Sequence, residues 1–314
     1  MSSKRPIILV VDDQPGCSAD FIARRLARHM AEQLQLNVIV ENRAEDGEGS
    51  SAASIAKAAP DGYTLYMASR PTVLNQRLHK NRGYDFARDF APVAMITHVP
   101  YVLVTSNYVP GVKIQELLAQ DRSTQYGLAC ASDGDVGSTP RLIYEVLRER
   151  AELRWLDMPC DTDASALTAV IAGRANFAII GVPSAVPHLG SRGLRALAVF
   201  SGSRLPFLPV VPSIAEFDLS CAEAQGWFAL VVPSRTPTNF IERLNQVVNK
   251  ALAGVSVGKK LMQLGYTAPA AENTPQALGT FIAQDTERWV RVLAHRTNTR
   301  SPRPGKFNSG QAQL

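Results

Sequence analysis

The sequence predicts an α/β protein in which a mostly parallel sheet is covered by helices on both faces. Short, largely apolar segments alternate along the 314 residues with longer amphipathic segments of helical period. Short continuous apolar runs are typical of strands that are buried on both faces. Repeated strand–helix units favour parallel pairing, because parallel neighbours need a crossover connection. Ligands of such folds bind beyond the carboxyl ends of the strands.

The strand pattern recurs along most of the chain, and the first helix is marked along one face. The expected strands are 7–11, 38–41, 64–68, 93–97, 101–105, 126–131, 177–181, 194–200 and 227–232. A helix is expected over 18–35, since apolar residues recur there every four positions and keep one face apolar. These residues are Ile22, Leu26, Met30 and Leu34.

Three Thr-Pro pairs mark the starts of further helices. Threonine can cap the first free N–H groups, and proline fits the first helical position because no N–H is needed there. Asp163 is expected to cap another helix, which ends near Gly173. The loops in which a ligand is expected are 12–18, 69–74, 132–139, 159–163 and 181–184. The Thr-Pro pairs are Thr139-Pro140, Thr236-Pro237 and Thr274-Pro275.

Composition and charge exclude several classes of protein. Hydrophobic residues make up 46% and charged residues 19% of the chain, as in ordinary soluble globular proteins. No apolar run reaches the roughly 18 residues of a membrane span, so no membrane insertion is expected. The four cysteines lie far apart, and neither a metal site nor a cofactor is expected. The basic segment 296–314 is expected to be a disordered, solvated tail and not a nucleic-acid contact.

The stretch "ILVVDDQPG" at 8–16 ends a strand with two aspartates, Asp12 and Asp13. A phosphoacceptor receiver domain has such a pair, but it also has an aspartate after its third strand and a lysine on its fifth. Here the third expected strand runs into Ser69-Arg70, and Lys113 follows the fifth only after a loop. The receiver hypothesis is therefore rejected. Because side chains alternate along a strand, only one of the two aspartates is expected to face a ligand.

Several stretches together resemble one protein family. They include "VENR" at 40–43, "AKAAPDGYTL" at 56–65, "YDFARDFAPVAMI" at 84–96, "WFALVVPSRTP" at 227–237 and "ENTPQALGTFIAQDTERW" at 272–289. In this order and spacing they are similar to the Bug-type, TctC-like extracytoplasmic solute-binding proteins of tripartite tricarboxylate transporters. The resemblance implies a periplasmic-binding-protein (type II-like) fold, with two α/β lobes, a ligand cleft between them and no enzymatic activity.

The resemblance also implies domain boundaries and partners. One lobe would combine 1–100 with 225–295, and 101–224 would form the other, with chain crossings at 99–103 and 221–227. Members of the family close around small carboxylates and pass them to a membrane permease. The expected partners are therefore a small organic solute and that permease, and the expected location is the periplasm. The N-terminal residues show no export signal, which leaves a cytoplasmic location as the alternative.

Two helix N-termini suit an anionic solute, because free N–H groups there carry a partial positive charge. Residues 16–18 and 137–139 each begin a helix after a strand, one in each implied lobe. Each is either an ordinary cap or half of an anion site, and together they would bind the two ends of a dicarboxylate. The expected ligand-binding residues are Asp13, Gln14, Gly16, Cys17, Ser18, Ser69, Arg70, Thr72, Gly137, Ser138, Thr139, Asp161, Thr162 and Gly181.

The chain departs from the family pattern at this implied site. Members usually read Pro-Phe-Pro-Pro-Gly-Gly where this chain has the run from Asp12 to Cys17, so Asp13 replaces an aromatic residue. Asp161 adds a carboxylate to a loop that usually resembles VPYKG. One carboxylate near 5 Å from a bound carboxylate costs roughly 3 kcal/mol, about two decades of affinity. Either the ligand carries an amine or hydroxyl groups, or the site binds weakly.

Two arginines and one cysteine leave further alternatives open. Arg70 either contacts the ligand or lies in solvent, and Arg141 is expected in solvent. Cys17 lies at a helix N-terminus, where the pKa of a thiol tends to fall. No histidine is placed to act as its base, so a thiol enzyme is disfavoured. A solute-binding protein of a transporter is the favoured function, and a Bug-like sensor or interaction protein with a weak ligand site is the alternative.

Overall fold

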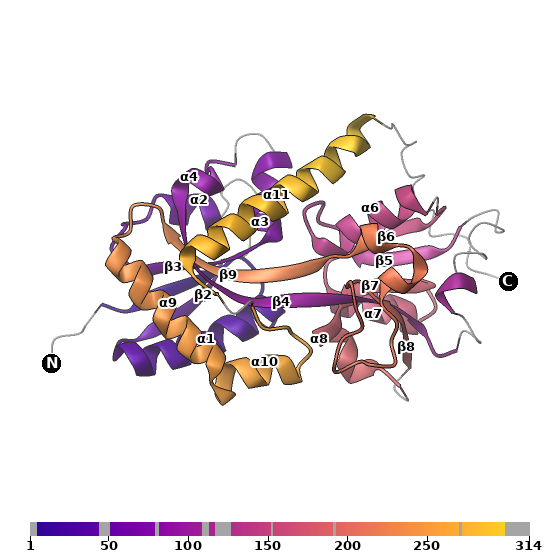
Figure 1. The fold of residues 1–314 in the computed structure, drawn as a ribbon, viewed down its shortest axis with the longest axis horizontal. Coiled ribbons are helices and arrows are strands. Elements are labelled where there is room, and N and C mark those ends of the chain that lie inside the picture. The colour runs from indigo at the N-terminus through magenta and orange to yellow at the C-terminus, as the bar shows by residue number, and fades with distance from the viewer. Residues whose placement is uncertain are drawn as a thin grey trace.

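A computed structural model describes residues 5–43, 51–78, 82–108, 113–116, 127–151, 153–190, 193–269 and 272–298. Figure 1 shows two α/β lobes that lie side by side and are connected by long strands. The prediction of a two-lobed α/β fold is therefore confirmed. Residues 296–298 end a helix, contrary to the expected tail, and the rest of that expected tail lies outside the described residues.

The first lobe is built on four whole strands and the first part of a fifth. The strands are β1 (Ile7–Val11), β2 (Val38–Asn42), β3 (Thr64–Ser69), β9 (Gln225–Pro233) and the beginning of β4 (Phe90–Ser106). The helices of this lobe are α1 (Ser18–Leu34), α2 (Ser51–Ala56), α3 (Arg70–Leu78), α4 (Phe86–Asp89), α9 (Thr238–Ala253), the π-helix η4 (Val255–Lys259) and α10 (Lys260–Gln263). The long helix α11 (Pro275–Asn298) begins there.

The second lobe is built on the remaining strands and the end of β4. The strands are β5 (Ala129–Asp133), β6 (Leu156–Cys160), β7 (Phe177–Gly181) and β8 (Leu194–Val199). The α-helices are α6 (Thr139–Arg150), α7 (Asp163–Ile171) and α8 (Val182–Ala185). Short 3-10 helices are η1 (Val186–His188), η2 (Ile214–Phe217) and η3 (Ser220–Ala222). No helix among the described residues has the length and apolar character needed to cross a membrane.

One sheet runs through both lobes in the order β2-β1-β3-β9-β4-β7-β5-β6, with β8 also paired to β4. The pairs of β1 with β2 and β3, and of β5 with β6 and β7, are parallel. Every pair that involves β4 or β9 is antiparallel. The sheet is therefore mixed and not mostly parallel as predicted, because these two strands run between the lobes and do not belong to strand–helix–strand units.

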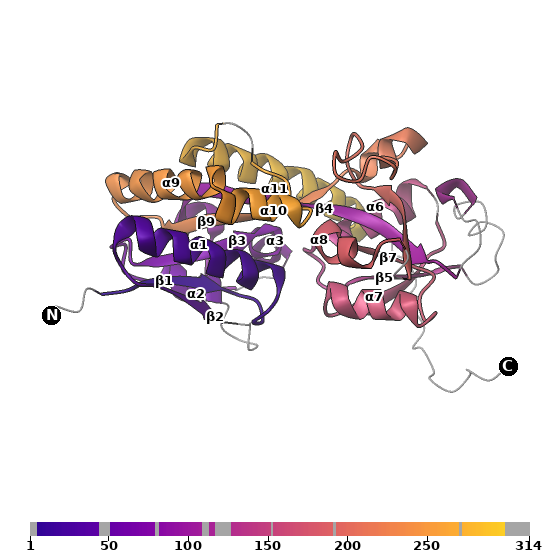
Figure 2. The same cartoon turned by 90° about the horizontal axis from the view of Figure 1, so that it is seen from below.

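β4 carries the chain from the first lobe to the second (Figure 2). It is one strand, whereas the sequence predicted separate strands at 93–97 and 101–105. Its residues up to Pro100 pair with β9, and from Tyr101 onward they pair with β7. Pro100 lies between the two predicted segments, at the point where the strand changes partner.

No strand was predicted over β6, which the structure places at the edge of the second lobe's sheet. Its residues are mostly half-buried or exposed, so the segment lacks the continuous apolar run of an inner strand. It also contains Pro159, which is tolerated at an edge because no further strand needs its N–H. An edge position therefore explains why the apolar pattern missed this strand.

The four-residue stripe of α1 is buried as predicted. Ile22, Leu26 and Met30 are fully buried in one core with Leu9 of β1 and Val248 of α9. Burying a side chain of this size stabilises a fold by about 1.5–3 kcal/mol relative to leaving it exposed. The stripe thus fixes α1 against the sheet and places its N-terminus at the end of β1.

Two of the predicted threonine caps have different outcomes. The Ala277 N–H donates to the Thr274 hydroxyl over 3.1 Å, so Thr274 caps α11 as predicted. The Thr236 hydroxyl instead donates to the carbonyl of Pro233 over 2.7 Å, and α9 has no side-chain cap. The Thr-Pro pattern therefore located this helix, although the capping role was wrong.

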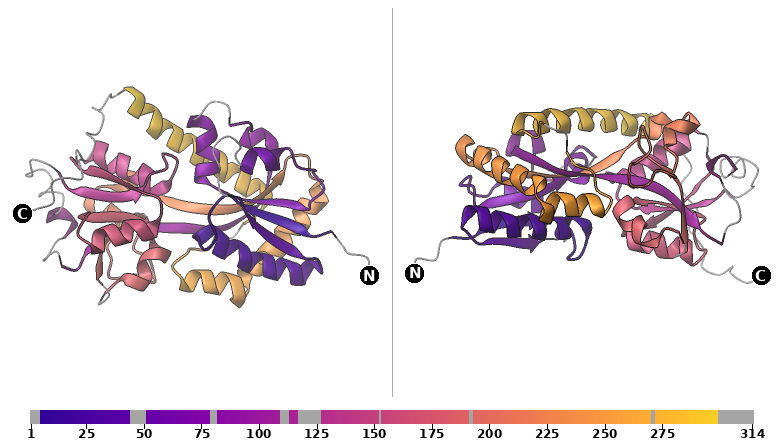
Figure 3. Two further views of the ribbon diagram at one scale, coloured as in Figure 1. Left: turned by 180° about the vertical axis from the view of Figure 1, so that it is seen from behind. Right: turned by 60° about the horizontal axis from the view of Figure 1, so that its bottom comes forward.

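Helix α11 extends from the first lobe across to the second (Figures 1 and 3). Leu278 and Ile282 are buried in a first-lobe core with Tyr66. Trp289 and Leu293, further along the helix, are buried in a second-lobe core with Ile143. One apolar stripe is thus divided between two cores. We call α11 the bridge helix.

Candidate functional site

Loops from both lobes bring three aspartates together where the lobes meet. Asp13 follows β1, Asp133 ends β5 and Asp163 begins α7. The pKa of Asp133 is raised to about 6, mainly by burial. The nearby carboxylates of Asp135, Asp163 and Asp13 contribute to this rise. Because Asp13 belongs to the first lobe and the others to the second, this effect joins the two lobes at one place. We call Asp13, Asp133 and Asp163 the carboxylate cluster.

Asp12 and Asp13 face different parts of the protein. The hydroxyl of Tyr66, which is fully buried, donates a hydrogen bond to Asp12. The Asp13 carboxylate accepts from the Gln14 N–H over 2.8 Å and from the Cys17 thiol. The alternation expected along the strand therefore turns Asp12 into the first lobe and leaves Asp13 in the carboxylate cluster.

The Cys17 thiol does not have the low pKa that a helix N-terminus favours. Burial, followed by the charge and hydrogen bond of Asp13, raises the pKa of this thiol to about 11. The thiol is then protonated at neutral pH, and a protonated thiol is a poor nucleophile. The expected lowering of the pKa was wrong, because it considered the helix and not the adjacent carboxylate.

Three glycine amides among the predicted ligand-binding residues donate to aspartates of the chain itself. Each bond joins a glycine N–H at a strand or helix end to one carboxylate oxygen. Charge-assisted bonds of this kind are stronger than neutral ones, so a ligand carboxylate has to compete with them. The pairs are Gly16 with Asp20 at 2.9 Å, Gly137 with Asp135 at 2.8 Å and Gly181 with Asp163 at 3.1 Å.

Asp163 does not cap α7 as predicted. The Thr162 hydroxyl is the cap and accepts from the Ser165 N–H over 3.1 Å. The Asp163 carboxylate instead accepts from the Ser184 hydroxyl over 2.7 Å and from Gly181. Burial raises the pKa of Asp163, although these hydrogen bonds oppose the rise. A residue assigned to helix capping is therefore part of the carboxylate cluster.

Arg70 is a buried structural residue and not a solvated one. Its side chain is only 3% exposed. The guanidinium donates to both carboxylate oxygens of Asp285 over 2.8 Å, to the Gln225 carbonyl over 2.6 Å and to the Thr139 hydroxyl. Because its charge is paired with Asp285, it does not offset the carboxylate cluster.

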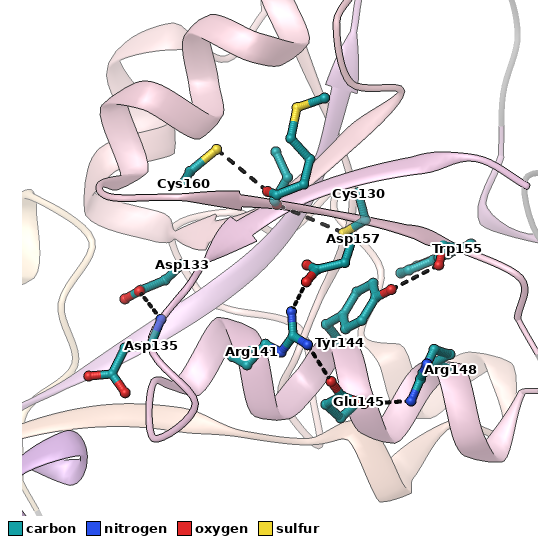
Figure 4. Close-up of polar contacts among 12 residues, drawn as sticks. Cys130, Asp133, Asp135, Arg141, Tyr144, Glu145, Arg148, Trp155, Asp157 and Cys160 are labelled. Atoms are coloured by element: carbon teal, nitrogen blue, oxygen red, sulfur yellow. Dashed lines mark hydrogen bonds and ion pairs between the residues drawn. The ribbon is translucent and has the colours of Figure 1, made fainter. Parts of the chain in front are cut away.

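Arg141 is half-buried, contrary to the expected solvent exposure, and Figure 4 shows the carboxylates that pair with it. Its side chain is 13% exposed and forms ion pairs with Glu145 at 2.7 Å and with Asp157. Its guanidinium carbon lies 5.1 Å from the centre of the Tyr144 ring. Two carboxylates match its charge within the second lobe, so Arg141 does not offset the carboxylate cluster either.

Four other predicted ligand residues form part of the framework around the cluster. Thr72 is buried and accepts from the Ser69 N–H over 3.3 Å, within the first lobe. Ser138, and not Thr139 as predicted, caps α6. Thr139 is buried and accepts from Arg70. These contacts make their side chains structural in the described state.

The remaining predicted residues lie on the surface or beside the cluster. Gln14, Gly16, Asp161 and Thr162 are exposed. Asp161 is not among the carboxylates that raise the pKa of Asp133. Of the predicted set, the structure brings Asp13, Cys17, Ser18, Gly137 and Gly181 to the junction between the lobes. The ligand-binding role of these residues remains a prediction.

Two tyrosines that the sequence analysis did not select lie beside the carboxylate cluster. Burial, followed by Asp163 and Asp133, raises the pKa of Tyr101. Burial also raises the pKa of Tyr266, whose hydroxyl is hydrogen-bonded to Ser18 and lies near Asp163. Both hydroxyls thus remain protonated, and the Tyr101 hydroxyl is hydrogen-bonded to Thr139.

Asparagine in place of Asp133 is expected to stabilise the protein at neutral pH. A carboxyl group whose pKa rises on folding, here to about 6, binds its proton more tightly in the folded state. The free energy of unfolding then falls as the pH rises from about 4 to about 6. Above about pH 6 the whole of this loss of stability is present. Urea denaturation should show a gain on the order of 2 kcal/mol at pH 7.5 and much less at pH 4.5. An equal gain at both pH values would contradict the raised pKa.

The fold and the site define the class of protein. Two α/β lobes joined by crossing strands, with polar loops of both lobes meeting at strand ends, are the architecture of a periplasmic-binding-protein receptor. The model of the tripartite tricarboxylate transporter family receptor, TctC, matches residues 22–297. The chain belongs to this family of solute-binding proteins, and the resemblance inferred from the sequence is confirmed.

Named relatives agree with this assignment. The protein BugT of Bordetella pertussis is 33% identical over 291 residues, which cover 92% of this chain and 88% of BugT. MatC of Rhodopseudomonas palustris with bound malate is 27% identical, with a TM-score of 0.81 and coverage of 92% of this chain and 99% of MatC. Rpa4515 of R. palustris with adipate is 28% identical, with a TM-score of 0.83 and coverage of 94% and 98%.

Proposed function

We propose that the protein captures a small organic solute between its lobes by closing around it, and passes it to the permease of a tripartite tricarboxylate-type transporter. Family membership and the ligand-bound relatives support this function. The periplasm is the proposed location, as the family implies. The proposed lobes are 1–100 with 225–295, and 101–224, since β4 changes partner between Pro100 and Tyr101.

The carboxylate cluster carries a narrower proposal about the solute. Three glycine amides among the predicted ligand-binding residues already donate to Asp20, Asp135 and Asp163. Two arginines that could neutralise the cluster are paired elsewhere. A second carboxylate near 5 Å costs a bound anion roughly 3 kcal/mol at an effective dielectric of 20. The proposed ligand therefore carries an ammonium group, or several hydroxyls, toward Asp133 and Asp163, and is not a plain dicarboxylate.

A thermal-shift screen of the purified protein tests the proposal. The set would include succinate, malate, adipate, amino acids, small amides and polyamines at pH 7.5 and pH 5. A ligand at a hundred times its dissociation constant adds about 2.7 kcal/mol to stability. We expect an ammonium-bearing compound to give the largest shift, and this shift to weaken at pH 5, because Asp133 is protonated below a pKa of about 6.

Variants of the carboxylate cluster test the proposed class of ligand separately from solute capture itself. Asp133→Asn and Asp163→Asn should each weaken binding of an ammonium compound by about tenfold to a hundredfold and strengthen binding of dicarboxylates. The matched control is Asp61→Asn. It disrupts an ion pair with Arg5, which lies away from the carboxylate cluster. Preference of the unaltered protein for a dicarboxylate would reject the narrower proposal. A screen without any shift would count against solute capture itself.

A further inference from the structure

Arg70 joins three segments that are far apart in the sequence. It is the first residue of α3, and its guanidinium is almost completely buried. Its donors reach Asp285 on the bridge helix, the carbonyl of Gln225 at the start of β9 and the hydroxyl of Thr139 at the start of α6. A single side chain thus connects the bridge helix and β9, two of the elements that run between the lobes, to the first turn of a second-lobe helix.

The partner of Arg70 is held as firmly as Arg70 itself. Besides the bidentate pair, Asp285 accepts from the indole N–H groups of Trp227 over 3.0 Å and of Trp289 over 3.2 Å. The Arg70 guanidinium carbon lies 5.2 Å from the centre of the Trp289 ring. Bidentate arginine–carboxylate pairs are both strong and specific in geometry. The orientation of the guanidinium is therefore fixed by groups that do not include Thr139.

The loop that precedes Thr139 packs against α3. The Asn75 amide donates to Asp135 over 3.1 Å. A Cβ atom added to Gly137 would lie 2.9 Å from the Asn75 side-chain oxygen and 3.3 Å from the Pro71 Cα atom. This same loop connects Asp133 of the carboxylate cluster to α6. The position of the loop, and with it part of the ligand site, thus depends on how the second lobe rests on α3.

We propose that the Arg70–Thr139 hydrogen bond is an interlobe latch, which holds the lobes at their resting angle and positions the loop of Asp133. Within this latch Arg70 is a positioning residue: Asp285 and the two tryptophans aim it, and Thr139 is its acceptor in the second lobe. Opening or closing the lobes about the crossing strands stretches this bond. The inference rests on the proposed movement of the lobes, and it goes beyond solute capture by naming the contact that sets the resting state.

The variant Thr139→Val tests the latch with little change in shape. It removes the acceptor of Arg70, together with the hydrogen bond between Thr139 and Tyr101, but leaves the bidentate pair of Arg70 with Asp285 in place. Thr139→Ser keeps the hydroxyl and should restore the behaviour of the unaltered protein. Asn75→Ala, which removes an exposed contact of the same loop, is the matched control.

Distances across the junction give the readout, and they need no ligand. Genetically encoded spin-label amino acids at the exposed positions Arg28 of α1 and Thr168 of α7 would leave the native cysteines untouched. Pulsed electron–electron double resonance should show one main distance between the two labels in the unaltered protein. In Thr139→Val we expect a second population, with about a tenfold rise in its ratio to the first, as loss of one charge-assisted hydrogen bond predicts.

Two results would overturn the latch. One is a distance distribution of Thr139→Val that equals that of the unaltered protein. The other is an equal change in Asn75→Ala, because the effect would then belong to the loop and not to Arg70. Arg70→Lys provides a second test, since a lysine cannot reproduce the fork of donors and should also populate the second distance. A protein that binds no solute but shows these shifts keeps the latch and rejects the proposed function.

Discussion

Alanine in place of Asp285 is expected to lower the free energy of unfolding by about 3–5 kcal/mol. The change removes the only carboxylate paired with the Arg70 guanidinium in the described structure, and leaves a cation that is 3% exposed without its counter-charge. It also removes the acceptor of the Trp227 and Trp289 indole N–H groups. Urea denaturation followed by tryptophan fluorescence and circular dichroism measures the loss.

A neighbouring ion pair on the same helix serves as the control for Asp285→Ala. Glu287 and Arg291 are paired at 3.2 Å, but their side chains are 71% and 78% exposed. Exposed pairs contribute about 0–1 kcal/mol, so Glu287→Ala should change stability by less than about 1 kcal/mol. Losses of similar size in the two variants would show that Asp285 acts as an ordinary helix residue and not as the centre of a buried network.

Alanine in place of Gly127 is expected to lower the free energy of unfolding by about 3 kcal/mol, through two separate effects. Gly127 has φ of +68°, a left-handed conformation that side chains disfavour. An added Cβ atom would also lie 2.0 Å from the carbonyl oxygen of Arg154, a backbone atom of the segment that leads into β6. The two segments cannot separate without disturbing the pairing of β5 with β6.

Gly173→Ala isolates the conformational effect from the steric one. Gly173 has nearly the same φ of +70°, but no atom lies within 4 Å of an added Cβ. Its substitution should therefore cost only about 1 kcal/mol. Thermal and urea unfolding of both variants give the comparison. Equal losses would mean that the β5–β6 region yields easily and that the close approach at Gly127 carries no penalty.

Local patterns in the sequence predicted most of the fold. Apolar runs located β1, β3 and β7, and the stripe of Ile22, Leu26 and Met30 located α1, because burial imposes these periods on neighbouring residues. The predicted break within β4 failed for a different reason. The pairing on either side of Pro100 depends on strands that lie more than seventy residues later in the chain. A local pattern of residues carries no information about these partners.

The candidate site was predictable only in part. The rule that ligands lie beyond strand ends selected Asp13 and also the loop 132–139, but within that loop Asp133 was not chosen as a ligand residue. Asp163 was assigned to capping, since a sequence does not show whether a carboxylate turns toward its own helix or toward Ser184. No signal marked Tyr266.

The two arginines show the limit most clearly. Arg70 and Asp285 are 215 residues apart, yet they form the most buried ion pair described. Without that partner in view, burial of an arginine is unfavourable and solvent exposure is the natural expectation. Arg141 was misjudged for the same reason, because Asp157 approaches it from the strand β6 that the apolar pattern had missed.

The place of β9 in the sheet also determines the order in which the newly made chain can fold. This strand lies between β3 and β4, although it comes from residues Gln225–Pro233. The strands of the second lobe have all left the ribosome before it appears, and domains tend to fold as units during synthesis. The lobe that begins the chain must therefore wait, with an open edge at β3, until more than two thirds of the protein has been translated.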